Sequence, residues 1–434
     1  MWSFILSFSI PLITLLVQLS SSFILSHYPS FSHSSYCEQN LINVRSLSHS
    51  PDTILGAINQ SQRFYPCSTH PYNLQLCQEH YLVVWNSKKG FFDYQKEQYN
   101  GGEIDFTYTV HSSISHLKRI DNVLKNWSGR INLSLFVLWK EIPYAQRFLN
   151  QVKTDRIDMI LFIVDNRHPL KPNDNCINRF NPNTHKLDCI QLSSIIYPIN
   201  ILRNLAIERV DTAYYLNMDA DIIPSPNLYQ SLRQMDFTPF INNNNAFIIP
   251  IFQFTSLYRS TCSDDSCFER MVTQIPQSTS QILQCMHNHQ CQVANAYLTT
   301  HRIIDDDWWR LNQTIQILHC IPFDRMEPYV MVKRSLNTPL YDPIFINYGF
   351  NKIEFIMELR QSGFSFHVLT GVFGFDAPHK ESEMAKSFNG NQEGKERMRV
   401  FFSSFLNRMK RMNSTPIQPI CNKEEALKRY RTVF

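Results

Sequence analysis

The chain has 434 residues, of which 43% are hydrophobic and 18% are charged, and its formal net charge is +4. This composition excludes a mostly disordered protein and supplies enough apolar side chains for one large domain with accessory segments, or for two domains. Glycine occurs only 11 times and forms no glycine-rich phosphate-binding loop, so a nucleotide would have to be bound without a P-loop or a dinucleotide fingerprint.

The N-terminal 25 residues are almost wholly apolar, and the first charged residue of the acidic and basic types is Glu38. We predict a secretory signal peptide or an uncleaved signal-anchor at residues 1–25, with the membrane as a partner and the rest of the chain in the lumen. If the segment is cleaved, the protein is secreted instead. Residues 26–100 are rich in Ser, His, Asn and Pro, and we expect them to form a lumenal stem and a segment tied by cysteines.

The chain contains 11 cysteines, a number that favours an oxidising compartment. Their odd count leaves at least one without an intramolecular partner. Several are spaced as short-loop disulfide pairs: Cys67 and Cys77, Cys176 and Cys189, Cys262 and Cys267, Cys285 and Cys291.

The first ordered elements are predicted as a strand at residues 104–110, a helix at 114–127 and a strand at 131–139. Two strands joined by a helix of this length suggest a βαβ unit. His111 and Ser113 would then lie at the C-terminal edge of the sheet, where a nucleotide could bind, although a simple helix cap explains them equally well.

The next predicted elements are a helix at residues 143–152 and a strand at 158–164. A polar insertion between residues 166 and 189 is expected to be a disulfide-closed loop. The helix that opens at Tyr197 contains Arg203, whose guanidinium could pair with a neighbouring acid or bind a diphosphate or sugar carboxylate.

Two acids follow a buried strand that begins at Tyr214. Asp219 and Asp221 stand one residue apart where this apolar run ends, and in an extended chain their side chains would point to the same side. Two carboxylates at this edge of an α/β sheet suit Mg²⁺ or Mn²⁺ carrying a phosphate-bearing partner. The alternative is that they cap the next helix or face water.

Later in the chain, an acid or a histidine stands next to several predicted strands. Glu327 precedes the strand at residues 329–332, and Asp342 leads into a segment before the helix at 353–361. His379 follows the strand at 364–369 after Pro378 and could complete an oxygen-rich metal site, although a capping role is also open. The remaining predicted elements are a helix at 226–235 and a strand at 246–254.

The basic C-terminal part has its apolar residues at helical spacing between residues 397 and 411. This pattern predicts an amphipathic helix docked by its apolar face, with its charged face in solvent. Since the chain is expected to be lumenal, nucleic acid is not an expected partner.

Taken together, the ordered motifs resemble glycosyltransferase family 49, which includes the LARGE-type xylosyl- and glucuronyltransferases of dystroglycan and the β-1,4-glucuronyltransferase that acts on the same glycan. The resemblance covers roughly residues 104–410. It rests on these motifs: Tyr197-Pro198-x-Asn200-x-Leu202-Arg203-Asn204-x-Ala206, Asp219-Ala220-Asp221, Glu327-Pro328-Tyr329, Tyr341-Asp342 through Gly349-Phe350-Asn351-Lys352, Ile356-Met357-Glu358-Leu359 and Pro378-His379.

The resemblance implies a GT-A fold, that is, an α/β domain with a Rossmann-like central mixed sheet flanked by helices, at residues 101–412, followed by a tail at 413–434. It also implies a type II Golgi enzyme that uses Mn²⁺, or Mg²⁺, and a UDP-sugar. Glucuronic acid or a related sugar would be transferred, with inversion, to a glycan or glycoprotein.

The resemblance also assigns roles to individual residues. Asp219 and Asp221 would hold the metal and the sugar donor, and His379 would be the further metal ligand. An inverting reaction also needs a carboxylate base at the acceptor hydroxyl, for which Glu327 and Asp342 are the candidates. Glu327 is preferred because it precedes a strand, although a structural salt bridge explains either acid equally well. The expected donor-binding set is His111, Ser113, Arg203, Asp219, Asn351 and Lys352.

Two positions depart from the family pattern. Asp376 stands where family members often have a histidine, which would alter the metal shell, and Phe350 stands where a tryptophan is usual, which would alter a substrate pocket. These departures keep open an alternative in which the chain is a catalytically degenerate member that binds glycan or assists another enzyme.

Overall fold

The structure is a computed structural model, and the residues that it describes all belong to the unit formed by residues 42–434. The described residues are 80–86, 104–152, 155–165, 176–181, 186–191, 197–241, 244–256, 265–295, 298, 301–304, 308, 314–335, 337–379, 390–412 and 416–430.

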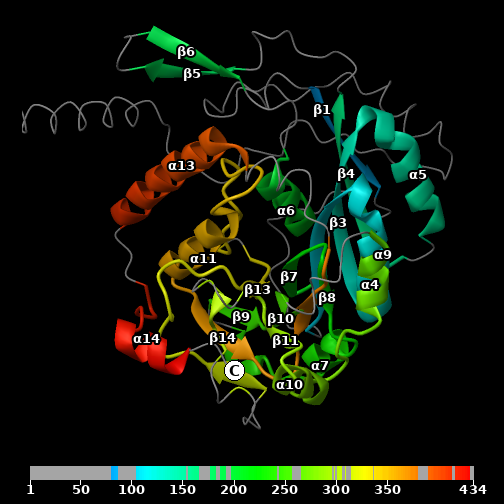
Figure 1. Cartoon of the computed structure of the whole chain (residues 1–434), viewed down its shortest axis with the longest axis vertical. Coiled ribbons are helices and arrows are strands. Elements are labelled where there is room, and N and C mark those ends of the chain that lie inside the picture. Colours follow the sequence, from blue (N-terminus) through cyan, green and yellow to red (C-terminus); the bar gives the residue numbers. More distant parts are fainter. Residues whose placement is uncertain are drawn as a thin grey trace, which may run out of the picture. The chain divides into compact units, whose positions relative to one another are not determined.

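A nine-stranded mixed sheet organises this unit (Figure 1). Its strands, in spatial order, are β1 (His80–Asn86), β4 (Ile157–Asp165), β3 (Arg130–Leu138), β2 (Phe106–Ser113), β7 (Tyr214–Asp219), β13 (Tyr329–Lys333), β9 (Asn245–Ile249), β14 (Ser365–Leu369) and β12 (Ile315–Ile317).

The inner strands β4, β3, β2 and β7 are parallel, as the predicted βαβ unit requires. β1 pairs antiparallel at one edge, and β13 runs antiparallel between β7 and β9. The near-continuous burial of β2 and β3 is typical of strands covered on both faces. This mixed sheet with flanking helices confirms the predicted α/β fold class.

Two hydrophobic clusters cover the two faces of the sheet, and alternate residues of one strand enter different clusters. On β7, Tyr214 and Leu216 belong to one cluster and Tyr215 to the other. Helices α4 (Leu117–Asn126) and α5 (Ile142–Gln151) contribute to the first cluster.

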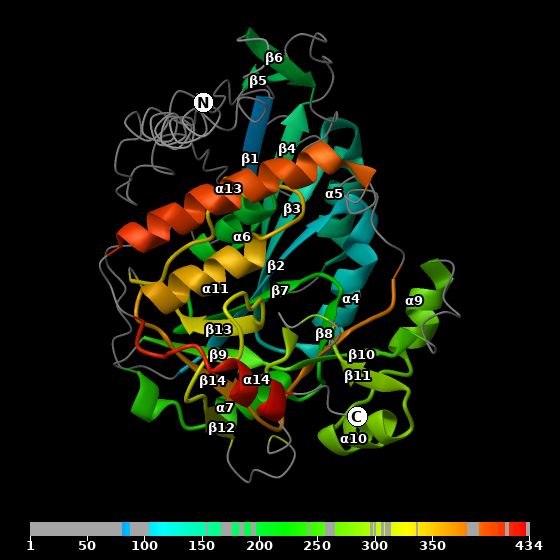
Figure 2. The same cartoon turned by 60° about the vertical axis from the view of Figure 1, so that its left-hand side comes forward.

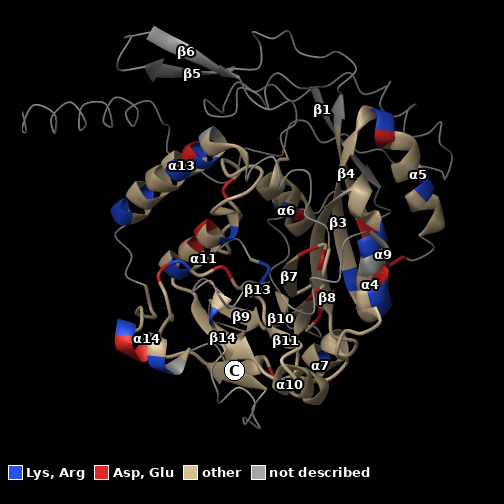
Figure 3. Ribbon diagram, in the orientation of Figure 1, with Lys and Arg blue, Asp and Glu red and all other residues tan. Residues whose placement is uncertain are grey.

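The second face of the sheet carries helices α6 (Ile199–Glu208) and α11 (Asn351–Gln361). In Figure 1, α4 and α5 lie on one side of strands β3 and β4, and α6 lies on the other side. Helix α13 (Gln392–Arg411) lies beside α11 (Figures 1 and 2). The amphipathic helix predicted at residues 397–411 is therefore present and begins earlier, and its Lys and Arg residues are visible in Figure 3.

The other described helices are α7 (Leu228–Gln234), α9 (Asp265–Val272), α10 (Thr279–His287) and α14 (Lys423–Arg429), with 3₁₀ turns at Ile114–His116, Trp139–Glu141 and Thr238–Phe240.

The strand predicted at residues 246–254 is in fact two strands in different sheets. β9 ends at Ile249 and β10 (Ile251–Phe254) joins a second, four-stranded sheet. Pro250 separates them, because a proline has no N–H to continue a ladder, while its carbonyl accepts a hydrogen bond from Gly374 N at 2.9 Å.

The second sheet has the order β11 (Cys291–Val293), β10, β15 (Gly374–Asp376) and β8 (Ile222–Pro224). A Cβ at Gly374 would lie 2.7 Å from Ile251 Cδ1 and 2.8 Å from Ile222 Cγ2, so a larger residue here would require these isoleucine side chains to shift. In the register of β15 and β8, Asp376 lies opposite Ile222, directly after Asp221. The second sheet thus brings Asp376 beside the predicted acid pair.

Two parts of the chain differ from the sequence prediction. β1 lies in the segment predicted as stem, where apolar periodicity is absent. The insertion predicted as a loop forms a hairpin of β5 (Cys176–Asn181) and β6 (Lys186–Gln191).

Two disulfides are present in the described residues. Cys285–Cys291 confirms one predicted short-loop pair, whereas Cys320–Cys421 joins residues 101 positions apart and was not predicted. The other predicted pairs are Cys67 with Cys77, Cys176 with Cys189, and Cys262 with Cys267. Each of them includes a residue or a side chain that lies outside the described part of the structure.

The predicted membrane partnership is corrected by the structure. Within the described ranges, no helix combines the length and the apolar character needed to cross a bilayer. The apolar residues 1–25, on which the prediction rested, lie outside those ranges. The expected membrane partner is therefore without support in the described part of the chain.

Candidate functional site

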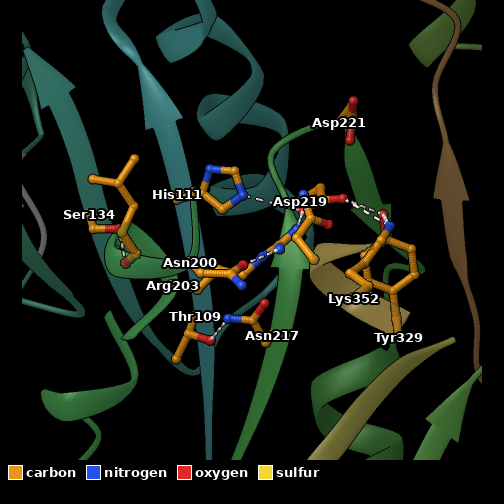
Figure 4. A network of polar contacts seen from close by, with 12 residues as sticks. Thr109, His111, Ser134, Asn200, Arg203, Asn217, Asp219, Asp221, Tyr329 and Lys352 are labelled. Atoms are coloured by element: carbon orange, nitrogen blue, oxygen red, sulfur yellow. Dashed lines mark hydrogen bonds and ion pairs between the residues drawn. The ribbon is translucent and has the colours of Figure 1, made fainter. Parts of the chain in front are cut away.

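Asp219 is the last residue of β7 and lies at the centre of a polar network (Figure 4). β2 pairs parallel with β7 and places His111 directly opposite Asp219. The carboxyl ends of these parallel strands meet at one edge of the sheet, which is where open α/β sheets bind their ligands. His111 therefore lies where the sequence predicted it.

Four side chains bind the Asp219 carboxylate. Its Oδ1 atom accepts a hydrogen bond from Arg203 Nη2 at 2.9 Å and lies 3.3 Å from His111 Nε2. Its Oδ2 atom accepts hydrogen bonds from Tyr329 Oη at 2.7 Å and from Lys352 Nζ at 3.2 Å. Side chains from α6, β2, β13 and α11 thus converge on one acid.

The charge balance around Asp219 keeps it ionised. Burial by itself would raise the pKa of this carboxyl, but Lys352, Arg203 and His111 outweigh burial and hold the pKa well below its usual value. Arg203 is only 1% exposed, and Lys352 Nζ lies 4.2 Å from the centroid of the Tyr329 ring. Two cations, the buried Arg203 and the partly buried Lys352, therefore share a single carboxylate.

A second cluster lies at Asp221, which Figure 4 shows apart from Asp219. Ligand atoms of Asp221, Asp376 and His379 all lie within 4.8 Å of one another, and His379 Nε2 is 2.8 Å from Asp221 Oδ2. Burial would raise the pKa of Asp221, but chiefly the contact with His379 lowers it to about 2. Two carboxylates and one imidazole form a donor set that fits Mn²⁺ or Mg²⁺.

The predicted extended geometry of the two acids is wrong. β7 ends at Asp219, and Ala220 and Asp221 form a turn before β8. The period-two argument that placed both side chains on one side holds only within a strand. The turn separates the two carboxylates into the Asp219 network and the group of Asp221, Asp376 and His379.

The other predicted donor-binding residues differ in their placement. Lys352 joins the Asp219 network, but the amide of Asn351 donates instead to the carbonyl of Asn347 at 3.4 Å. Ser113 Oγ lies 2.9 Å from Ser115 Oγ at the start of a 3₁₀ turn. No described contact joins Asn351 or Ser113 to Asp219.

The two candidate bases lie in different surroundings. Glu327 Oε1 is 3.8 Å from His301 Nδ1, and Glu327 together with Asp219 counters the effect of burial and raises the pKa of Lys352. Asp342 Oδ2 instead lies 2.9 Å from Arg408 Nη2 on helix α13. Glu327 is therefore the candidate that interacts with a residue of the Asp219 network.

Tyr197, Asn200 and Tyr329 belong to the site but are absent from the residues predicted for it. Tyr197 Oη lies 2.9 Å from His111 Nδ1, and Asn200 Oδ1 accepts a hydrogen bond from Arg203 Nη1 at 3.1 Å. All three belong to motifs that carry the family resemblance. Tyr197 and Asn200 lie in the same motif as Arg203, and Tyr329 lies in the same motif as Glu327, so their position in these motifs could have predicted a place in the site.

Asp376 and Phe350, the two departures from the family pattern, have different surroundings. Asp376 offers an oxygen ligand in the group with Asp221 and His379, so the change from histidine replaces one possible metal ligand with another. Phe350 has a left-handed backbone, with φ of 60°, and stacks on Phe402 of α13 at a centroid distance of 4.3 Å. Phe350 therefore packs against a helix next to the site.

A family model described as "Glycosyl-transferase for dystroglycan" matches residues 105–413. The chain is 26% identical over 314 residues to the xylosyl- and glucuronyltransferase LARGE1 of Danio rerio, a match that covers 71% of this chain and 35% of that protein. With the protein of the same name from Mus musculus it is 27% identical over 310 residues, covering 70% of this chain and 35% of that protein. The chain thus spans about a third of the length of the curated relatives it matches.

Among solved structures, the chain is similar to GalNAc-T7 crystallised with UDP, GalNAc and Mn²⁺, with a TM-score of 0.38 and 10% identity over 76% of this chain and 57% of that chain. It is also similar to residues 1–349 of TarS from S. aureus, with a TM-score of 0.34 and 10% identity over 70% of this chain and 71% of that chain.

Proposed function

The chain belongs to the family of glycosyltransferases for dystroglycan, and from this premise we propose that it transfers a sugar from a UDP-sugar to a glycan or glycoprotein, in a reaction that needs a divalent metal. The sugar class is glucuronic acid or a related sugar, and residues 101–412 form the catalytic domain. The observation that carries the proposal is the pair of adjoining clusters, one at Asp219 and one at Asp221.

The group of Asp221, Asp376 and His379 would hold the metal, Mn²⁺ or Mg²⁺. When bound, the metal supplies positive charge for the diphosphate that leaves with UDP. Asp376 offers an oxygen ligand at the position where relatives often have histidine, which supports a working site over a degenerate one. We retain Asp219 as a residue that contacts the donor or the metal, held in place by Arg203 and Lys352.

Glu327 is our choice as the catalytic base. A base must remove the proton of the acceptor hydroxyl as that oxygen attacks the sugar. Glu327 interacts with Lys352 of the Asp219 network, whereas the Asp342 carboxylate is bound by Arg408. A base opposite the leaving diphosphate corresponds to a single displacement and therefore to inversion of the transferred sugar.

The proposed compartment is the lumen of the Golgi. Two disulfides in the described residues, Cys285–Cys291 and Cys320–Cys421, are stable in an oxidising compartment.

The decisive experiment is a screen of the common UDP-sugars with and without Mn²⁺, read as UDP release by the purified protein. Asp221→Asn and Asp376→Asn should each lower the Mn²⁺-dependent rate by about 100-fold or more. The same variants should weaken Mn²⁺ binding in calorimetry, a readout that does not depend on turnover.

Glu396→Gln, on the exposed face of α13, is the matched control, because Glu396 pairs only with the exposed Arg399 in the described contacts. It should leave the rate and the Mn²⁺ affinity unchanged. Wild-type activity in Asp221→Asn, or equal UDP release without metal, would overturn the proposal.

A further inference from the structure

Glu354 is a fully buried carboxyl on α11 that takes no direct part in either cluster of the site. It lies two residues after Lys352 and is 0% exposed. Its Oε1 atom accepts hydrogen bonds from Asn200 Nδ2 at 3.1 Å and from the backbone N–H of Asp342 at 3.0 Å. A side chain this costly to bury is expected to hold something in place.

Hydrogen bonds connect Glu354 in series to Asp219. Asn200 donates from Nδ2 to Glu354, and its Oδ1 accepts from Arg203 Nη1 at 3.1 Å. Arg203 then donates from Nη2 to Asp219 Oδ1 at 2.9 Å. Figure 4 shows Asn200 and Arg203 lying next to one another on the way to Asp219.

The middle members of this series have little freedom to find other partners. Asn200 is 0% exposed and Arg203 is 1% exposed, so water does not replace a lost protein contact at either side chain. The second donation of Asn200 Nδ2, to the carbonyl of Asp342 at 2.9 Å, holds the amide in one orientation. The orientation of the amide decides whether its oxygen faces Arg203.

The charge around Glu354 favours its neutral form. Burial, Asp342 and Glu358 together raise the pKa of Glu354 well above its usual value. Its second oxygen, Oε2, is buried and makes no hydrogen bond within the described part of the chain. A neutral carboxyl and a glutamine amide both present one carbonyl oxygen to Asn200.

We propose that Glu354 is a positioning residue, whose acceptor oxygen orients Asn200 and, through it, the Arg203 guanidinium that holds Asp219 for binding of the UDP-sugar. The inference rests on the proposed function, since it assigns Glu354 a role in the same site. It concerns the hydrogen-bond acceptor at Glu354 rather than a negative charge there.

The test compares Glu354→Gln with Glu354→Leu. Gln keeps the acceptor oxygen and should bind UDP in the presence of Mn²⁺ within about threefold of the wild type. Leu keeps a similar volume without an acceptor and should weaken UDP binding about tenfold or more, as expected for one lost buried hydrogen bond. UDP affinity is measured by calorimetry, and the melting temperature of each variant is recorded alongside it.

Glu396→Gln is the control, because Glu396 lies on the exposed face of α13 and pairs with Arg399 in the described contacts. A role confined to stability would lower the melting temperature of Glu354→Leu and leave the UDP affinity of the folded protein unchanged, which would overturn the proposal. Equal loss of affinity in Glu354→Gln and Glu354→Leu would overturn it as well.

If Glu354→Leu does not fold, Asn200→Ser interrupts the same series one step closer to Arg203. A tenfold weaker affinity for UDP in this variant supports the proposal, and wild-type affinity overturns it. The wild-type protein distinguishes failure of the proposed function from failure of this inference. If the wild type binds no UDP, both proposals are wrong. If the wild type binds UDP and the variants bind it equally well, only the role of Glu354 is wrong.

Discussion

Asp219 and Asp221 are separated by one residue, but the structure gives them different surroundings. Arg203, Lys352, Tyr329 and His111 occupy both oxygens of Asp219. Asp221 lies beyond the end of the strand with a histidine as its nearest described ion-pair partner. An acid that already neutralises two cations is suited to fix geometry, whereas one next to another carboxylate and an imidazole is suited to hold a metal.

Tyr329 gives a test of the Asp219 network at the level of one hydroxyl group. Tyr329→Phe removes the 2.7 Å hydrogen bond to Asp219 Oδ2 and leaves the ring beneath Lys352 in place. We expect kcat/KM for the UDP-sugar to fall about tenfold, because loss of one hydrogen bond should raise the activation free energy by roughly 1.4 kcal/mol. Steady-state kinetics with Mn²⁺ measure it.

Tyr215→Phe is the control for this substitution. Tyr215 is a tyrosine on β7, 1% exposed, whose hydroxyl makes no hydrogen bond within the described residues. Loss of that hydroxyl should leave kcat/KM unchanged. Equal kinetics for the two variants would mean that the Tyr329 hydroxyl does not support Asp219.

At the level of elements, helix α13 is joined to the site through α11. Phe402 of α13 stacks on Phe350, which precedes α11, and Arg408 of α13 lies 2.9 Å from Asp342 and 3.7 Å from Glu358. Apolar packing and ion pairs therefore act together where the basic helix meets the acids (Figure 3). The start of α11 carries Lys352, so this packing supports the site.

Glu358 makes the stability of this helix pair depend on pH. Burial raises its pKa to about 7, an effect that Arg408 opposes and Asp342 reinforces. Because the folded state binds the proton more tightly than the unfolded state, stability is highest below the ordinary glutamate pKa and falls as the pH rises to about 7. Glu358 should contribute about 2–3 kcal/mol to this fall.

Glu358→Gln should therefore gain stability over the wild type as the pH is raised from about 4.5 to about 7. Urea unfolding of both proteins at several pH values measures the difference in unfolding free energy. A difference that stays constant with pH, or that shrinks as the pH rises, would contradict the raised pKa.

At the level of the whole molecule, Cys320–Cys421 joins the chain after β12 to the segment before α14 across 101 positions. Cross-links that close long loops restrict the unfolded chain most. Replacing both cysteines by serine should cost about 5 kcal/mol, against about 2 kcal/mol for the same change at Cys285–Cys291, which closes only a short loop.

Calorimetric unfolding of the two double variants tests this order. The same chemical change is made at both disulfides, so the two variants differ in the length of the loop that is released. The Cys320→Ser, Cys421→Ser variant releases the longer loop and should show the larger drop in melting temperature. An equal or reversed order would mean that native packing, and not the length of the closed loop, decides the effect.

Much of the fold could be predicted because its signal is local. The buried runs at β2, β3, β4 and β7 and the helical spacing of α4 and α13 are carried by neighbouring residues. The strand β1 was not predicted, because the sequence pattern of an edge strand is weak and its place in the sheet depends on its partner, here β4. The break at Pro250 shows that one apolar run can serve two sheets.

Local sequence patterns predict the α/β class, the end of a buried strand at Asp219 and the place of Lys352 at the start of a helix. Which side chains meet at the site depends on how the distant segments pack together. Lys352 lies 133 positions from Asp219 along the chain, and Asp376 reaches Asp221 through the pairing of β15 with β8. Such contacts depend on the order of strands and the turns between them, and local periodicity carries no record of either.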